Sequence, residues 1–243
     1  MIDQKSVLAV IPARGGSKGL PKKNILKLAD KPLISWSIDV AKESKYIDKC
    51  IVSTDNKEIK NISEDYGCEV PFIRPLELAS DKATTIDTVI HAIEYYRKKN
   101  IYYDYFILLE PTSPLREVYD IDDALINLHN KRDYADSIVG VSKIEATHPI
   151  FDLRIDDKGL ISPYIGEKFR TIRRQDIEPL YFLEGTIYIS KIENLLKEKT
   201  FYHDRTLSHI VPRWKSAEID DLSDMLYVES LIKNKLELKN REL

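Results

Sequence analysis

Short apolar runs alternate with helical periods over the first 140 residues, and this alternation constrains the fold more than any other feature of the chain. The apolar runs are typical of buried strands, while the segments between them repeat their apolar residues at helical spacing. Strands are expected at residues 7–11, 49–53, 68–73, 105–109 and 136–141, and helices at 32–44, 56–66, 87–98 and 120–131. Because a strand, a helix and a strand in succession form a right-handed crossover, the pattern predicts an α/β fold with a mostly parallel sheet.

The pattern changes after residue 141. Turn residues separate the apolar runs around Ile155 and Ile161, as in a β-hairpin. We therefore expect residues 143–180 to form a small inserted antiparallel lobe, and a strand at 186–189 to return to the sheet. An amphipathic C-terminal helix should then close the domain with Met225, Leu226, Val228 and Leu231. Since single cores grow up to roughly 250–300 residues, one domain over residues 1–243 is the prediction.

Charge and composition exclude several classes of partner. Lysine and arginine number 37 against 40 aspartate and glutamate residues, a net charge of -3. This balance predicts no nucleic acid partner and no binding to an anionic membrane. The sequence contains no run of about 18 apolar residues and no signal-peptide pattern, and Cys50 and Cys68 fit buried small side chains in a reducing compartment. A cytoplasmic location is expected.

A glycine-rich basic loop follows the first expected strand and occupies residues 12–24. Ligands of parallel sheets lie beyond the carboxyl ends of the strands. Glycines let backbone N–H groups approach phosphate oxygens, and arginine and lysine supply the charge that a triphosphate needs. Arg14 and Lys18 suit neutralisation of a pyrophosphate leaving group. The loop matches neither the P-loop nor the dinucleotide-binding motif. The alternative is a solvated basic loop without a ligand.

The run Ile-Pro-Ala-Arg-Gly-Gly-Ser-Lys-Gly at residues 11–19, with Lys23 and Asn24, resembles the signature of the acylneuraminate cytidylyltransferases, the CMP-sialic acid synthetase family. Further segments resemble family motifs in the family's order, at residues 74–81, 111–116, 174–175 and 185–189. The resemblance implies a Rossmann-like nucleotidyltransferase with a small inserted dimerisation lobe. It would join CTP to a nine-carbon, nonulosonic sugar acid by attack of the anomeric hydroxyl on the α-phosphate, releasing pyrophosphate. It would require Mg²⁺ and work as a homodimer whose inserted lobes reach the partner's site.

The resemblance also implies roles for individual residues. Catalysis is expected from Arg14, Lys18 and Asp220. Nucleotide contacts are expected from Ala13, Arg14, Gly15, Lys23, Asn24, Arg74, Ser80, Thr85 and Glu110. Acceptor contacts are expected from Pro111, Thr112, Ser113, Arg174, Gln175, Tyr188, Phe201 and Tyr202. Arginine grips a carboxylate through two parallel hydrogen bonds, which suits Arg174 to a sugar acid. The alternatives are a surface position for Arg74 and ordinary core or interface packing for the aromatic residues.

The acidic segment before the last helix is a candidate metal site. In an extended chain Glu218 and Asp220 would point to the same side. Mg²⁺ prefers oxygen ligands and usually takes only one or two protein carboxylates. The resemblance implies Asp220 as the main ligand and places Glu218 where a second aspartate often stands. The alternative is that Asp220 or Asp221 only caps the helix.

The sequence departs from the family pattern at three positions. Glu110 stands where a glutamine that reads the base is usual, and because an ionised carboxylate only accepts hydrogen bonds, GTP is kept as an alternative nucleotide. Phe151 often corresponds to a lysine, so we expect a less polar acceptor of the legionaminic or pseudaminic type at least as readily as N-acetylneuraminate. Glu184 replaces the usual asparagine. A nucleotide-binding homologue without turnover is the remaining alternative.

Overall fold

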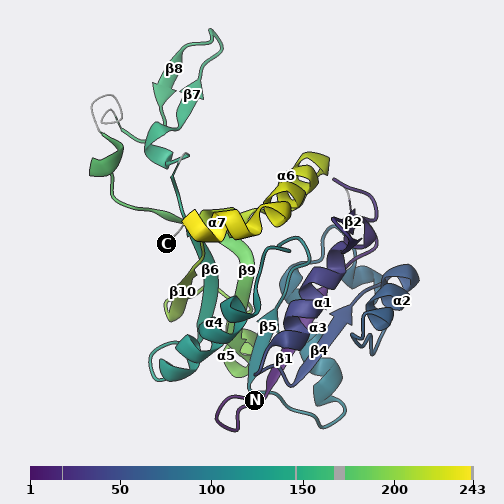
Figure 1. Cartoon of the computed structure of the whole chain (residues 1–243). Helices are drawn as coiled ribbons and strands as arrows, with labels where there is room; N and C mark the ends of the chain where they lie inside the picture. The colour runs from purple at the N-terminus through teal and green to yellow at the C-terminus, as the bar shows by residue number, and fades with distance from the viewer. Residues whose placement is uncertain (18, 146, 167–172, 242–243) are drawn as a thin grey trace.

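The computed structural model describes residues 1–17, 19–145, 147–166 and 173–241. A six-stranded sheet has the order β10-β6-β9-β5-β1-β4, and helices lie on both sides of it (Figure 1). Its strands are β1 (Val7–Pro12), β4 (Lys49–Ser53), β5 (Tyr105–Leu108), β6 (Ser137–Lys143), β9 (Tyr181–Lys191) and β10 (Thr206–Ile210). β1 pairs in parallel with β4 and β5, and β10 pairs in parallel with β6. These pairings confirm the expected α/β fold with a mostly parallel sheet.

β9 is antiparallel to both of its neighbours, β5 and β6. Its direction follows from the segment inserted before it, because β6 leads out of the sheet and the chain returns beside β6. The inserted segment contains β7 (Leu153–Ile155) and β8 (Ile161–Pro163), which pair antiparallel as the hairpin pattern predicted. We call residues 144–180 the arm. Its hairpin projects away from the sheet (Figure 1).

Helices cover the two faces of the sheet and divide the core. They are α1 (Leu33–Glu43), α2 (Lys57–Asp65), α3 (Thr85–Arg97), α4 (Val118–Asn130), α5 (Ile192–Glu198), α6 (Leu222–Lys233) and α7 (Lys235–Arg241). On one face Ala9 of β1 shares a core cluster with Ile38 of α1 and Ile121 of α4. On the other, Leu8 shares a cluster with Val89 of α3 and with α5. Successive residues of β1 thus enter different cores, which is why the run is apolar throughout.

A short antiparallel pair, β2 (Lys27–Leu28) and β3 (Lys31–Pro32), follows the glycine-rich loop. A third core cluster lies beyond the carboxyl ends of β1 and β5. It joins Leu28 and Leu115 to Ile219 and to Met225 and Val228 of α6. This cluster holds the C-terminal segment against the loops that follow β1 and β5.

The prediction of a strand at residues 68–73 is wrong. The segment makes only isolated bridges to the region of β4, Ile51 with Glu69 and Thr54 with Ile73. Pro71 lies between these bridges and has no N–H group to donate, which interrupts the ladder. The segment still runs beside β4, and the Arg74 N–H donates to the Thr54 carbonyl at 2.8 Å. Arg74 therefore reaches the carboxyl end of the sheet.

Helix ends and the last helix differ from expectation in detail. α3 begins at Thr85 rather than at residue 87, because Thr84 and Asp87 form a capping box. α6 buries Met225 and Val228 as expected, whereas Leu226 is 61% exposed, so its predicted place in the core is wrong. Among the described residues, no helix is both long enough and apolar enough to cross a membrane.

Candidate functional site

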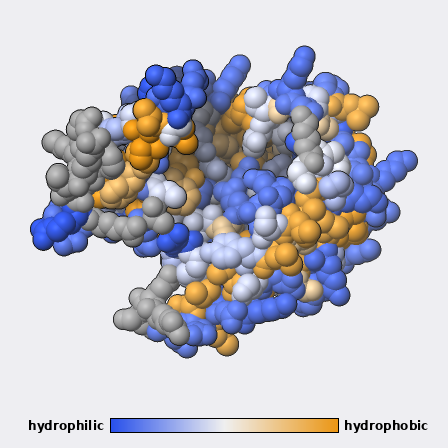
Figure 2. Space-filling view, turned by 90° about the horizontal axis from the view of Figure 1, so that it is seen from above, coloured by the Kyte–Doolittle hydropathy of each residue, from blue (hydrophilic) through white to orange (hydrophobic). Residues whose placement is uncertain are grey.

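A cavity of about 530 Å³ opens at the carboxyl ends of β1 and β5, on the side of the molecule seen in Figure 2. The glycine-rich loop, the segment leading into α3, the loop after β5 and the acidic segment before α6 form its walls. Predicted site residues that line it are Arg14, Lys23, Asn24, Arg74, Ser80, Thr85, Glu110, Pro111, Thr112 and Asp220. Lys18 lies outside the described residues. Segments far apart in the sequence therefore meet at one cavity.

Local hydrogen bonds shape the glycine-rich loop. The Ala13 N–H donates to the Ser53 carbonyl at 2.9 Å, and the Gly15 N–H donates to Asp55 Oδ1 at 2.8 Å. Asn24 Nδ2 donates to the Arg14 carbonyl at 3.0 Å. Ala13 is fully buried, and the Gly15 N–H is already paired. These two residues therefore hold the loop in place, and neither lines the cavity.

Gly19 lets the loop touch the acidic segment. A Cβ atom at Gly19 would lie 2.5 Å from the backbone oxygen of Asp220, whereas one at Gly16 would meet nothing within 4 Å. Gly19→Ala is therefore expected to displace the 218–220 segment and to lower, about tenfold or more, the transferase activity that the sequence resemblance implies. Gly16→Ala should keep activity within about twofold, since the same methyl group enters open space. Steady-state rates of the two variants test this, and equal losses would contradict it.

Arg74 is buried, so its alternative placement on the surface is wrong. Its guanidinium donates to Ser53 Oγ at 3.1 Å and to the Ser53 carbonyl. Burial lowers the pKa of Arg74 to about 10, so it remains a cation at neutral pH. On the exposed side of the cavity, Arg14 pairs with Asp81 Oδ1 at 3.1 Å. Both arginines thus place positive charge at one cavity, as a polyphosphate requires.

Lys23 joins the loop to the acidic segment. Its Nζ donates to the Ile219 carbonyl at 2.6 Å and to Asp220 Oδ1 at 3.0 Å. The Asp220 side chain is 82% exposed and faces the cavity. Asp221 instead caps α6, with its Oδ1 accepting from the Asp224 N–H at 3.0 Å. The capping alternative is therefore confirmed for Asp221, while Asp220 keeps its carboxylate at the cavity.

The carboxylates of Glu218 and Glu110 both lie beside Gly185 of β9. Glu218 Oε1 accepts from the Gly185 N–H at 2.6 Å, and a Cβ atom at Gly185 would lie 3.1 Å from Glu110 Oε2 and against Ser113 Oγ. Burial, followed by the charge of Glu218, raises the pKa of Glu110 to about 7. Burial also raises the pKa of Glu218. Ser113 is buried and does not line the cavity. Glu110, Glu218 and Asp220 thus form an acidic group beside the cationic loop.

Arg116 supports this group and was given no role by the sequence. It is buried and donates to the carbonyls of Glu110 at 3.1 Å and Gly185 at 3.0 Å, and also to Thr186 and Ser37. Burial lowers the pKa of Arg116 to about 10. The available signal was an arginine that ends the 111–116 motif just before a helix. Its bonds fix β9 to the loop after β5.

Glu184 does not line the cavity. It is 2% exposed, and its Oε2 accepts from the Thr186 N–H at 3.0 Å. Its Oε1 packs against Gly140 and has no hydrogen-bond partner among the described residues. Burial raises the pKa of Glu184 to about 6. Glu184, which stands where the family resemblance implies an asparagine, is therefore a residue of the protein interior and not of the cavity wall.

The predicted acceptor aromatics occupy two environments. The Tyr188 ring lies 5.6 Å from Phe201 and 6.1 Å from Tyr202. Burial and then the charge of Glu110 raise the pKa of Tyr188. Phe201 is 6% exposed and packs on Phe106. Phe201 is therefore a core residue, as the alternative reading had it.

The arm carries the remaining predicted acceptor residues. Gln175 and Phe151 line a separate cavity of about 250 Å³ at the base of the arm. Arg174 begins a short 3₁₀ turn, Arg174–Asp176, and its side chain lies outside the described part of the chain. Within one chain, Gln175 is thus not brought to the main cavity.

The donor chemistry of the cavity fits a hard divalent cation. Asp220 offers an exposed carboxylate, and Glu218 lies two residues away with one oxygen bonded to Gly185. In the described ranges no group of three or more His, Cys, Asp or Glu side chains could hold a metal ion. One or two carboxylates suffice for Mg²⁺ when phosphate and water complete its shell.

The cytidylyltransferase family model matches residues 8–229. The N-acylneuraminate cytidylyltransferase of Streptococcus agalactiae serotype III is 37% identical over 223 residues, 91% of this chain and 52% of that protein, so this chain spans about half of that relative. The CMP-N,N'-diacetyllegionaminic acid synthase of Legionella pneumophila is 35% identical over 228 residues, 93% of this chain and 96% of that protein. The solved structure of CMP:2-keto-3-deoxy-manno-octonic acid synthetase complexed with CTP has a similar fold, with a TM-score of 0.68 and 18% identity over 95% of this chain and 99% of that one. The family match contains the glycine-rich loop, Arg74, Glu110 and Asp220, and the chain belongs to the cytidylyltransferase family.

Proposed function

We propose that this protein activates a nonulosonic, sialic-acid-like sugar acid with CTP, giving the CMP-sugar and pyrophosphate. The observation that carries the proposal is one cavity lined by Arg14, Lys23 and buried Arg74 together with the carboxylate-bearing Asp220. Cations suit the polyphosphate, and a carboxylate suits a metal that accompanies it. The anomeric hydroxyl oxygen would bond to the α-phosphorus while the bond from that phosphorus to the bridging oxygen breaks. Pyrophosphate leaves, and the hydroxyl proton is released.

The residues of the cavity divide this work. Arg14, together with Lys18, would neutralise the charge that develops on pyrophosphate, and Lys23 would hold the loop against the acidic segment. Asp220, with Glu218 beside it, would hold Mg²⁺, which neutralises phosphate charge when bound. Arg74, Ser80 and Thr85 line the part of the cavity that leads into α3 and would contact the nucleotide.

The acceptor is proposed to be a diacetamido acid of the legionaminic or pseudaminic type. A relative that this chain matches over 96% of its length is named for such an acid, and Phe151 is an apolar ring where the family resemblance implies that a lysine is frequent. Tyr188 and Tyr202 would face the acceptor beside Glu110. Arg174 and Gln175 lie on the arm, so we propose that a second copy of the chain brings them to the cavity in a homodimer.

Pyrophosphate release with Mg²⁺ tests the proposal. CTP and GTP are each paired with N-acetylneuraminate, legionaminate, pseudaminate and 3-deoxy-octulosonate. Turnover is expected with CTP and a diacetamido acid. Turnover only with GTP would mean that Glu110 has changed the base preference, and a strong preference for N-acetylneuraminate would overturn the acceptor assignment. If no pair of substrates releases pyrophosphate, the result would favour a nucleotide-binding protein without turnover.

A further inference from the structure

A buried ion cluster lies behind the acidic segment. Lys215, in the 3₁₀ turn Arg213–Ser216, has a fully buried side chain. Its Nζ lies 2.9 and 2.8 Å from the two Asp120 carboxylate oxygens and 2.9 Å from Glu117 Oε2. It also contacts the Tyr119 hydroxyl and lies 3.9 Å from the centre of that ring. A lysine is almost never fully buried unless it is paired, and this one is held by the first turn of α4.

The cluster does not line the main cavity, so the proposed chemistry leaves it without a direct role. A buried ion cluster is weak evidence for a role in stability, because apolar residues of similar volume often stabilise the folded state equally well. What such a cluster does provide is a fixed geometry between the backbone segments that carry it. Here those segments are the start of α4 and the 3₁₀ turn before the acidic segment.

Both segments lead directly to the acidic group. Three positions after Lys215, Glu218 accepts from the Gly185 N–H at 2.6 Å, and the next residue, Ile219, donates its N–H to the Thr112 carbonyl at 2.9 Å. On the other side, Arg116 directly precedes Glu117 and donates to the Gly185 carbonyl at 3.0 Å. Gly185 is thus contacted from both directions, and Lys215 joins the two.

We propose that Lys215 is a positioning residue for Glu218 and Asp220, which acts by fixing the turn before them to the start of α4. The proposal rests on the proposed function only for the identity of the bound cation. Lys215 would set the affinity of the site for a divalent cation without touching the cation or the nucleotide. Loss of its ammonium group frees the acidic segment to move relative to Arg116 and Gly185, so that its carboxylates no longer converge.

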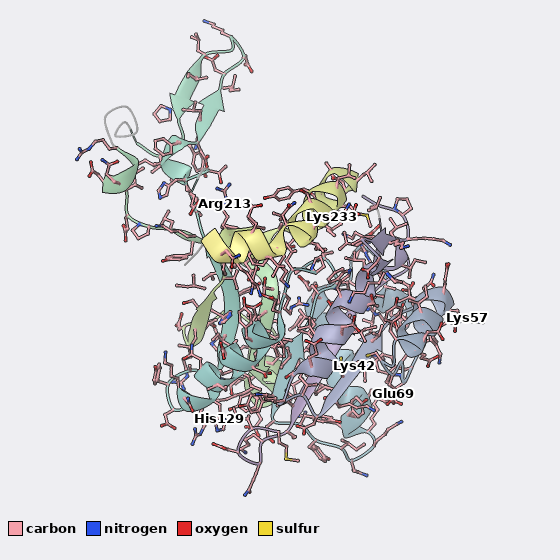
Figure 3. All side chains as sticks on the ribbon, in the orientation of Figure 1. Lys42, Lys57, Glu69, His129, Arg213 and Lys233 are labelled. Carbon is pink, nitrogen blue, oxygen red and sulfur yellow. The ribbon has the colours of Figure 1, made fainter. Side chains whose placement is uncertain are left out.

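Lys215→Met tests this against a control from the same turn. Arg213 lies at the base of the arm (Figure 3) and pairs with Glu145 at 3.2 Å in an exposed position, so Arg213→Met removes a cation and an ion pair without disturbing the buried cluster. Mn²⁺ binding, measured by electron paramagnetic resonance with and without CTP, is the main readout. Lys215→Met is expected to weaken Mn²⁺ binding and raise the half-saturating Mg²⁺ concentration about tenfold or more. KM for CTP at saturating metal should change less than about threefold, and Arg213→Met should stay within about twofold of wild type in every readout.

A double variant separates positioning from stability. Lys215→Met leaves the buried Asp120 carboxylate without its lysine, which can prevent folding, whereas Glu117 keeps its ion pairs with Lys235 and Lys239. Adding Asp120→Asn removes the Asp120 charge and keeps the side-chain shape. The folded double variant is expected to retain the weak Mn²⁺ binding, because the tie to α4 is still missing. Wild-type Mn²⁺ affinity in either folded variant would overturn the proposal. If the wild-type protein binds Mn²⁺ as expected but releases no pyrophosphate with any substrate pair, the proposed function fails while the positioning role stands.

Discussion

Replacing Asp220 with asparagine is expected to lower the rate of pyrophosphate release about 100-fold or more. The Asp220 carboxylate is 82% exposed at the cavity and its one described ion pair is with Lys23. An amide of the same shape keeps the contact to Lys23 possible but removes the negative charge that would hold a cation next to the phosphates. The effect should be largest at low Mg²⁺ and partly recovered as Mg²⁺ is raised.

The neighbouring aspartate provides the control for this prediction. Asp221→Asn makes the same chemical change one residue later, where the side chain caps α6. Asparagine caps helices about as well as aspartate, so this variant should keep both activity and stability. Asp220→Asn should also unfold within about 1 kcal/mol of wild type, since exposed ion pairs contribute little. Equal activity losses in the two variants would show that Asp220 has no special role.

Replacing Glu110 with glutamine is expected to stabilise the protein by about 3 kcal/mol at pH 8 in the absence of divalent metal. Burial and Glu218 raise the pKa of Glu110 from its usual value of 4.5 to about 7. The folded state therefore binds this proton more tightly than the unfolded state does. The corresponding stability is complete below pH 4.5 and is lost as the pH rises through 7. Glutamine carries no charge and escapes this loss.

Denaturant unfolding of both proteins between pH 4.5 and 8, in the presence of a chelator, measures the effect. The difference between the two unfolding free energies should be near zero at pH 4.5 and should grow until about pH 8. Glu58, on α2, pairs with Lys22 at 2.8 Å and is exposed, so Glu58→Gln serves as a control with a change below about 0.5 kcal/mol. A difference that stays constant with pH would show that Glu110 is not buried in its charged form.

The main outlines of the fold were predictable because they depend on local pattern. The alternation of apolar runs with helical periods predicted β1, β4, β5 and β6 and the helices between them. The hairpin of the arm was predictable from turn residues between two apolar runs. Residues 68–73 were mistaken for a strand because an apolar run says nothing about whether its N–H groups can complete a ladder, and Pro71 has none. β10, which pairs with β6, was not anticipated.

Some residues of the candidate site were also predictable from the sequence, and others were not. Arg14, Arg74 and Asp220 were identified from their motifs, and the fold brings all of them to one cavity. Phe201 was expected at the acceptor and lies in the core instead, since sequence does not reveal whether an aromatic ring in the connection between α5 and β10 turns toward the core or toward the surface. Arg116 and Lys215 were overlooked because their partners lie about 70 and 95 positions away in the chain.

The sequence by itself determined the α/β class and the glycine-rich loop with its basic residues, because these features depend on neighbours a few positions apart. The resemblance of its motifs also identified the family. Tertiary structure decided which groups share an environment. It brought Glu110 and Glu218 together beside Gly185, buried Lys215 against Asp120, and left the Asp220 carboxylate exposed. The physical reason is that pKa, ion pairing and metal affinity depend on distance and desolvation, and contacts between residues remote in sequence set both.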